Sequence, residues 1–205
     1  MKKLLLLLAL LAPASLKADE TFYTPAAMAC MREERCTEGI TKLSADNYSG
    51  EAKEILSNLD MMGVKVFKAI PQYFVEEYRG VYYSDDNNIF LNARYTRDHE
   101  RFLKILRHEG WHAAQDCMAG GMHNSELLGI YSHEDIPEHI IEETFARYGY
   151  HDPETIRIER EAVWVMYEPW MTVEALTACN SDAPMWETYF PPKETWRWLY
   201  WNGHI

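Results

Sequence analysis

The chain has 205 residues, of which 47% are hydrophobic and 25% charged, and its formal net charge is −12. This length and composition favour one folded domain with a sizeable core, and they exclude disordered, collagen-like and fibrous proteins. The acidic charge argues against a phosphate backbone as partner, so nucleic-acid binding is the least expected class of function.

Residues 1–18 have the features of a cleavable signal peptide. Two lysines stand near the start, residues 4–11 form an apolar run, and small residues follow. This pattern predicts export, with cleavage after Ala14 or Ala18. The apolar run is far shorter than the ~20 residues that span a bilayer, so we expect no transmembrane span in the mature chain. The protein is therefore expected to be secreted or to lie in the periplasm or envelope, as a single domain over 19–205.

The sequence contains four cysteines, which export would place in an oxidising compartment. We favour a local disulfide between Cys30 and Cys36 and a long-range one between Cys117 and Cys179. Three connectivities are possible, and four buried free thiols are the alternative. A structural zinc site is disfavoured because the sequence has no C-x-x-C pair.

Helical spacing and boundary residues predict two helices early in the mature chain, at 25–38 and 45–62, each ended by a glycine. The second is expected to start directly behind Ser44. The residue pattern then changes from helix to strand. Valines and a phenylalanine at 64–67 predict a strand, which Pro71 ends.

The next segment predicts a β-hairpin followed by a long helix. Strands are expected at 80–83 and 89–91, across a turn rich in serine, aspartate and asparagine at 84–88. From residue 97 onward apolar residues recur at threes and fours until Gly120 and Gly121 stop the run. The hairpin and the helix would therefore be direct neighbours along the chain.

The last third of the sequence predicts further helices. A polar connector at 123–134 precedes a helix opened by Pro137, then helices at 153–167 and 169–179. The tail at 195–201 is dense in aromatic residues. The fold class predicted from the whole chain is α+β, mostly helical, with a small antiparallel sheet beside the long helix.

The long helix contains the sequence His108-Glu109-Gly110-Trp111-His112. Residues four apart project side by side from a helix, so His108 and His112 can bind one metal ion. Glu109 leaves the helix about 100° from His108, where it can reach a water on the metal and act as a general base. Trp111 lies on the opposite side and is expected to contact the core. A chance match on a surface helix is the alternative.

A catalytic zinc site with two histidines needs a third protein ligand. Two carboxylates of the predicted helix at 153–167, Glu159 and Glu161, point to different faces. We favour Glu159, because Ala162 follows it by three residues and would let the helix approach the histidine helix closely. Glu161 is the main alternative, with Glu142 and Glu143 behind it, and any of them would otherwise be a solvated carboxylate paired with an arginine.

The order of hairpin, H-E-x-x-H helix and later helix with E-x-x-A resembles the gluzincin branch of the zincin metallopeptidases. The stretch 108–121 is also similar to uncharacterised bacterial zincin-like proteins. The resemblance implies a zincin-like domain in which His108, His112 and Glu159 bind zinc and Glu109 is the general base.

These observations lead us to expect an exported zinc-dependent hydrolase, a metallopeptidase that acts on a peptide or protein substrate. An oxyanion-stabilising donor is expected in such a site. Tyr148, Tyr150, His151 and Tyr167 are the candidates, and the sequence does not choose among them. The alternative is a non-catalytic zincin-like protein that binds zinc or an envelope partner. The substrate and the oligomeric state are left open.

Overall fold

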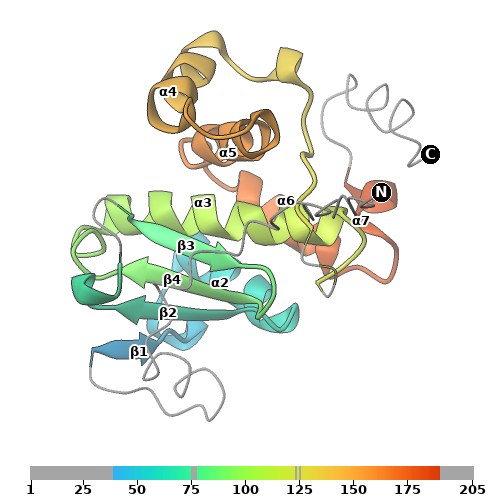
Figure 1. Cartoon of the computed structure of the whole chain (residues 1–205). Helices are drawn as coiled ribbons and strands as arrows, with labels where there is room; N and C mark the ends of the chain where they lie inside the picture. The colour runs from blue at the N-terminus through green and yellow to red at the C-terminus, as the bar shows by residue number, and fades with distance from the viewer. Residues whose placement is uncertain (1–38, 75–77, 123, 125, 190–205) are drawn as a thin grey trace, which may run out of the picture.

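The computed structural model describes residues 39–74, 78–122, 124 and 126–189. The predicted leader and the predicted helix at 25–38 lie outside these residues. The described residues form an α+β arrangement in which one long helix, α3, has the sheet on one side and two helices on the other (Figure 1). The predicted fold class is thus confirmed at this level.

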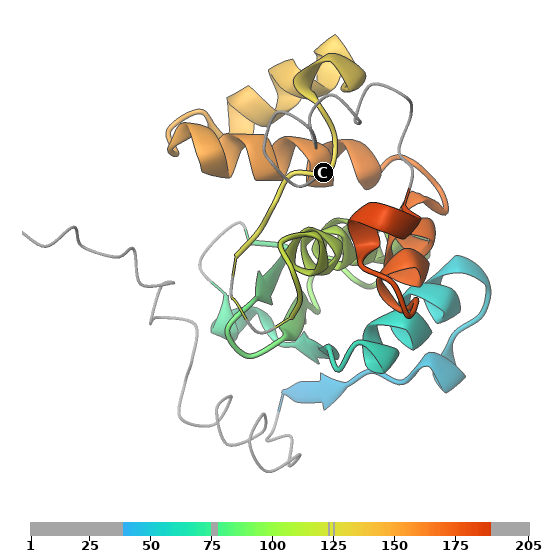
Figure 2. The ribbon, with the colours of Figure 1, turned by 90° about the vertical axis from the view of Figure 1, so that its right-hand side faces the viewer.

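The described helices, in chain order, are α2 (Gly50–Met61), α3 (His99–Met118), α4 (Glu138–Tyr148), α5 (Pro153–Val165), α6 (Met171–Cys179) and α7 (Met185–Thr188), with 3-10 turns at Ala45–Asn47, Pro71–Tyr73 and His133–Asp135. Turning the molecule by 90° shows the α4–α5 pair above α3, with α2 and the sheet below it (Figure 2). Within the described residues, none of the helices combines the length and the apolar character that crossing a membrane requires.

The sheet has four strands in the order β1-β2-β4-β3. They are β1 (Ile40–Lys42), β2 (Lys65–Ala69), β3 (Gly80–Tyr83) and β4 (Asn88–Asn92). The antiparallel β3–β4 hairpin is confirmed, with Val81 opposite Phe90. The expectation of a wholly antiparallel sheet is wrong, however, because β2 and β4 pair in parallel.

The parallel pair follows from the strand order: β3 runs opposite to β2 but lies at the sheet edge, and β4 turns back to fill the position between them, where it is covered on both faces. All five of its residues are buried, as is usual for strands of a parallel pair. Ile89 and Leu91 face the core that α2 and α3 share, whereas Phe90 stacks on Phe67 in a smaller cluster on the other face. β4 is thus hydrogen-bonded along both edges, to β2 and to β3, and buried on both faces.

The predicted helix at 45–62 is interrupted. Ser44 caps only a 3-10 turn, its hydroxyl accepting from the backbone N–H of Asp46, and the backbone is extended at Tyr48 and Ser49 before α2 begins. The ring of Tyr48 stacks on Phe102 of α3, with 5.1 Å between ring centroids. This tertiary contact favours the extended backbone over continuation of the helix.

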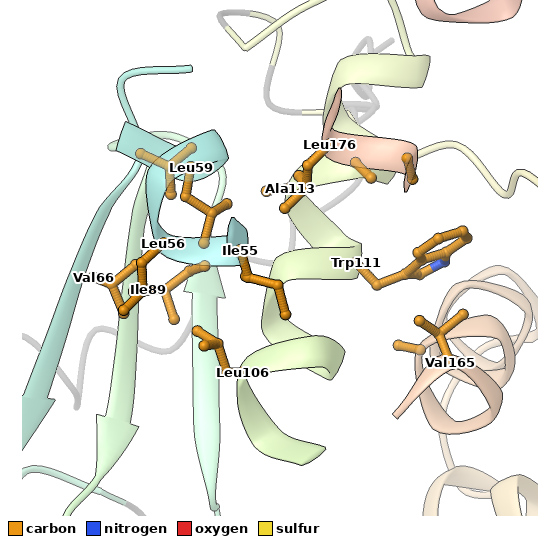
Figure 3. Packing of buried hydrophobic residues seen from close by; sticks show 14 of the residues in the cluster. Ile55, Leu56, Leu59, Val66, Ile89, Leu106, Trp111, Ala113, Val165 and Leu176 are labelled. Carbon is orange, nitrogen blue, oxygen red and sulfur yellow. The ribbon is translucent and has the colours of Figure 1, made fainter. Parts of the chain in front are cut away.

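Helix α3 is buried along most of its length because other layers pack on it from several sides. Its start is capped by Asp98, whose side chain accepts from the backbone N–H of Arg101. Leu106 packs toward Ile89 of the sheet, whereas Trp111, with no exposed surface, packs toward Val165 of α5 (Figure 3). The core contact expected for Trp111 is therefore present, and α3 connects the two halves of the core.

A disulfide joins the ends of α3 and α6. Cys117 and Cys179 lie 62 residues apart in sequence with their Cα atoms 6.2 Å apart, which confirms this predicted pair. The other predicted pair, Cys30–Cys36, lies outside the described residues. The bridge closes a long loop that includes α4 and α5.

Replacing Cys117 and Cys179 together with serine should lower the free energy of unfolding by about 4 kcal/mol, because the unfolded chain regains the entropy of a long open loop. Urea unfolding followed by far-UV circular dichroism measures the change. A double variant within 1 kcal/mol of the parent protein would show that the bridge adds little to stability.

Candidate metal centre

Two histidines of α3 and one glutamate of α5 converge on a single point. His108 and His112 are one helical turn apart, with their ring centroids separated by 4.9 Å. Nε2 of His108 lies 3.3 Å from Glu159 Oε2, and Nε2 of His112 lies 3.7 Å from Glu159 Oε1. One ligand atom from each residue falls within 4.8 Å of the other two.

These separations suit a metal ion. Nitrogen and oxygen ligands at typical zinc distances in a tetrahedral site lie about 3.3 Å from one another. Oε2 of Glu159 is buried and, although Nε2 of His108 lies 3.3 Å away, the two atoms do not form a well-aligned hydrogen bond, so a cation placed among the three ligands would satisfy this oxygen. The side chains of His108 and Glu159 keep 13% and 19% of their surface exposed, so the group still touches solvent. The donor set therefore fits zinc.

The structure distinguishes Glu159 from Glu161, the two main candidates for the third metal ligand. Glu159 faces the histidines, whereas Glu161 points away and is fully buried. Backbone N–H groups of Ile130 and Tyr131 donate to the Glu161 carboxylate at 2.9 and 2.7 Å. Side chains of α3 supply two further donors. The Glu161 carboxylate thus links α5 and the 130–131 segment to α3.

The two more remote alternatives lie outside the cluster. Glu142 is exposed, and Glu143 forms an ion pair with Arg147 on the same helix. Glu143 also accepts a hydrogen bond from the Tyr167 hydroxyl at 2.9 Å. Both side chains therefore have surface surroundings.

Glu109 lies beside the cluster and is itself only 5% exposed. It packs against the edge strand β3, where the backbone N–H of Tyr82 donates to it. Gly80 leaves the space for this side chain, since a Cβ at that position would stand 2.5 Å from Glu109 Oε1. Burial raises the pKa of Glu109 to about 7, against the opposing effect of His108. A carboxylate with such a pKa can both take up and release a proton near neutral pH.

The charges of the cluster are coupled. Burial by itself would raise the pKa of Glu159, but His112, His108 and a hydrogen bond from Tyr148 outweigh it and lower the pKa to about 2. Burial also lowers the pKa of His112. For His108, burial is outweighed by its contact with Glu159 and by the charge of Glu109, so its pKa is raised. The group thus holds one firmly ionised carboxylate facing two imidazoles.

Among the four residues considered as oxyanion donors, Tyr148 is the one that interacts with the cluster. Burial, together with the charges of Glu159 and Glu109, raises the pKa of the Tyr148 hydroxyl and so keeps it protonated. Tyr150 is 80% exposed and its ring contacts His151. The hydroxyl of Tyr167 is directed to Glu143. In this structure the protonated Tyr148 hydroxyl donates to the Glu159 carboxylate at the edge of the site.

The sequence analysis missed Gln115, whose Oε1 lies 2.8 Å from Nδ1 of His112. The signal was available, because a residue three positions after His112 lies on the same side of the helix. Glutamine has no distinctive metal chemistry, so spacing alone would have had to identify it.

Comparison of the chain with protein-family models, with curated proteins and with solved structures finds no match. The assignment of a function therefore depends on the residues and geometry of this site.

Proposed function

We propose that this protein is an exported zinc-dependent hydrolase, specifically a metallopeptidase. His108, His112 and Glu159 would hold the zinc ion and Glu109 would act as general base. The single observation that supports this best is the convergence of the two imidazoles and the Glu159 carboxylate within 4.8 Å, beside the buried carboxylate of Glu109.

The side chains around the cluster have complementary tasks in peptide hydrolysis. A zinc ion bound there would supply Lewis-acid activation of water and of the substrate carbonyl group. Glu109 takes the proton from the attacking water and delivers it to the leaving amine. Tyr148, whose hydroxyl donates to Glu159 in this structure, would turn its hydrogen bond to the carbonyl oxygen of the substrate as negative charge develops on it. Burial of Glu109 excludes bulk water from this proton transfer.

The proposed location and substrate class have a different basis. Export is supported by the features of a signal peptide at 1–18, and a peptide or protein substrate by the resemblance to gluzincins. A zinc-binding envelope protein without turnover would use the same three ligands. Hydrolysis has to be measured separately from zinc content to distinguish the two functions.

Protein purified after export should contain about one zinc ion per chain, measured by mass spectrometry of the metal. It should cleave members of a peptide library, and 1,10-phenanthroline should stop cleavage until zinc is restored. A His99→Ala variant is the matched control, because this histidine lies in the first turn of α3 and outside the cluster. Absence of zinc would refute the proposal, and zinc without cleavage would favour the non-catalytic alternative.

A further inference from the structure

Gln115 connects the two helices that carry the candidate ligands. Its side chain is fully buried between α3 and α5. Oε1 lies 2.8 Å from Nδ1 of His112, and Nε2 donates to the backbone carbonyl of Ile158 at 3.1 Å and to Glu161 Oε2 at 2.9 Å. Ile158 directly precedes Glu159, so the Gln115 amide contacts both His112 on α3 and the residue next to Glu159 on α5.

The neighbours of Gln115 determine which of its ends is oxygen. The backbone carbonyl of Ile158 can only accept, so the atom facing it must be the amide nitrogen. Oε2 of Glu161 gives the same answer independently. It already accepts from the Trp111 indole at 3.1 Å and from the backbone N–H of Ile130 at 2.9 Å, and both of these groups can only donate.

The orientation of the amide in turn determines the protonation of His112. The amide oxygen that faces Nδ1 has no hydrogen to give, so the 2.8 Å hydrogen bond requires a proton on Nδ1. A neutral imidazole with its proton on Nδ1 carries its lone pair on Nε2. Nε2 is the nitrogen that faces Glu159, at 3.7 Å from Oε1.

We propose that Gln115 is a positioning residue that holds His112 as the Nδ1–H tautomer and so directs the lone pair of Nε2 at the metal. This inference rests on the proposed zinc site. Glu161 and the Ile158 carbonyl hold the amide in place, and Gln115 thereby acts on the metal only through His112. Partners of this kind commonly orient metal-binding histidines, and their loss weakens metal affinity.

The tautomer can be measured in metal-free protein of the natural sequence. Nitrogen-15 NMR of the imidazoles should show His112 protonated at Nδ1, with a protected proton exchanging slowly because the bond is buried. His108 is an internal reference, since its ring contacts Glu159 and donates to the backbone carbonyl of Ala162, with Gln115 bonded to the other histidine. A His112 ring protonated at Nε2 would overturn the proposal without recourse to any variant.

Gln115→Leu removes the acceptor for Nδ1 and should lower zinc affinity about 10- to 100-fold, measured by competition with a chromophoric chelator. The His112 ring of the variant should populate both tautomers. Asn58→Leu is the matched control, because it removes a buried amide of α2 that bonds Asn180, and it should leave zinc affinity unchanged.

A folded Gln115→Leu protein with zinc affinity within threefold of the parent would also overturn the proposal. Failure of the proposed function is distinguishable from this result, because it would appear as a parent protein that binds no zinc at all. The tautomer measurement would then still decide whether Gln115 orients His112.

Discussion

Glu109→Gln should lower kcat/KM for peptide hydrolysis by about 10²- to 10⁴-fold while the protein keeps its zinc. Glutamine has nearly the shape of glutamate, and its amide oxygen can still accept from the backbone N–H of Tyr82. It cannot take up a proton, so the attacking water loses its base. Steady-state kinetics on a peptide identified in the library digest, together with metal analysis, measures both effects.

Glu100→Gln is the matched control for this variant. Glu100 lies in the first turn of the same helix, where its exposed carboxylate pairs with Lys104. The control should keep full activity, since an exposed pair of this kind contributes little. If Glu109→Gln retained the activity of the parent, Glu109 would not be the general base. If the Glu109→Gln protein instead lost its zinc, Glu109 would have a structural role in the site.

The local elements of this fold could be predicted from the sequence. Turn residues at 84–88 predicted the β3–β4 hairpin, and the apolar spacing after residue 97 predicted α3. The pairing of β2 with β4 could not be predicted, because it depends on β3 lying at the sheet edge with β4 between it and β2, a long-range arrangement that no local pattern encodes. The three-residue strand β1 is also too short to give a distinct pattern.

The local part of the site could likewise be predicted from the sequence, whereas the part that depends on packing could not. The pairing of His108 with His112 follows from helical geometry alone. The choice between Glu159 and Glu161 required knowing which face of α5 contacts α3, and that depends on packing. The buried carboxylate of Glu161 shows why, because sequence reasoning treats such a glutamate as solvated, yet four donors satisfy it inside the protein.

Glu159→Gln should lower zinc affinity by more than 100-fold, a larger loss than an outer partner such as Gln115 would cause. The amide that replaces the carboxylate brings no negative charge to the ion, and its NH₂ group would face an imidazole nitrogen 3.3 Å away. The stability of the metal-free protein should fall, because the imidazoles and the Tyr148 hydroxyl favour the charged form of Glu159 in the folded state and lower its pKa to about 2, and a neutral amide loses these interactions.

Chelator competition measures the affinity, and thermal unfolding of the metal-free protein measures the stability. Glu154→Gln on the same helix is the matched control, since its exposed carboxylate bonds Arg157 and lies outside the cluster. Unchanged affinity in Glu159→Gln would mean that another side chain completes the site. Loss of zinc and activity here, against loss of activity alone in Glu109→Gln, would separate the ligand from the base.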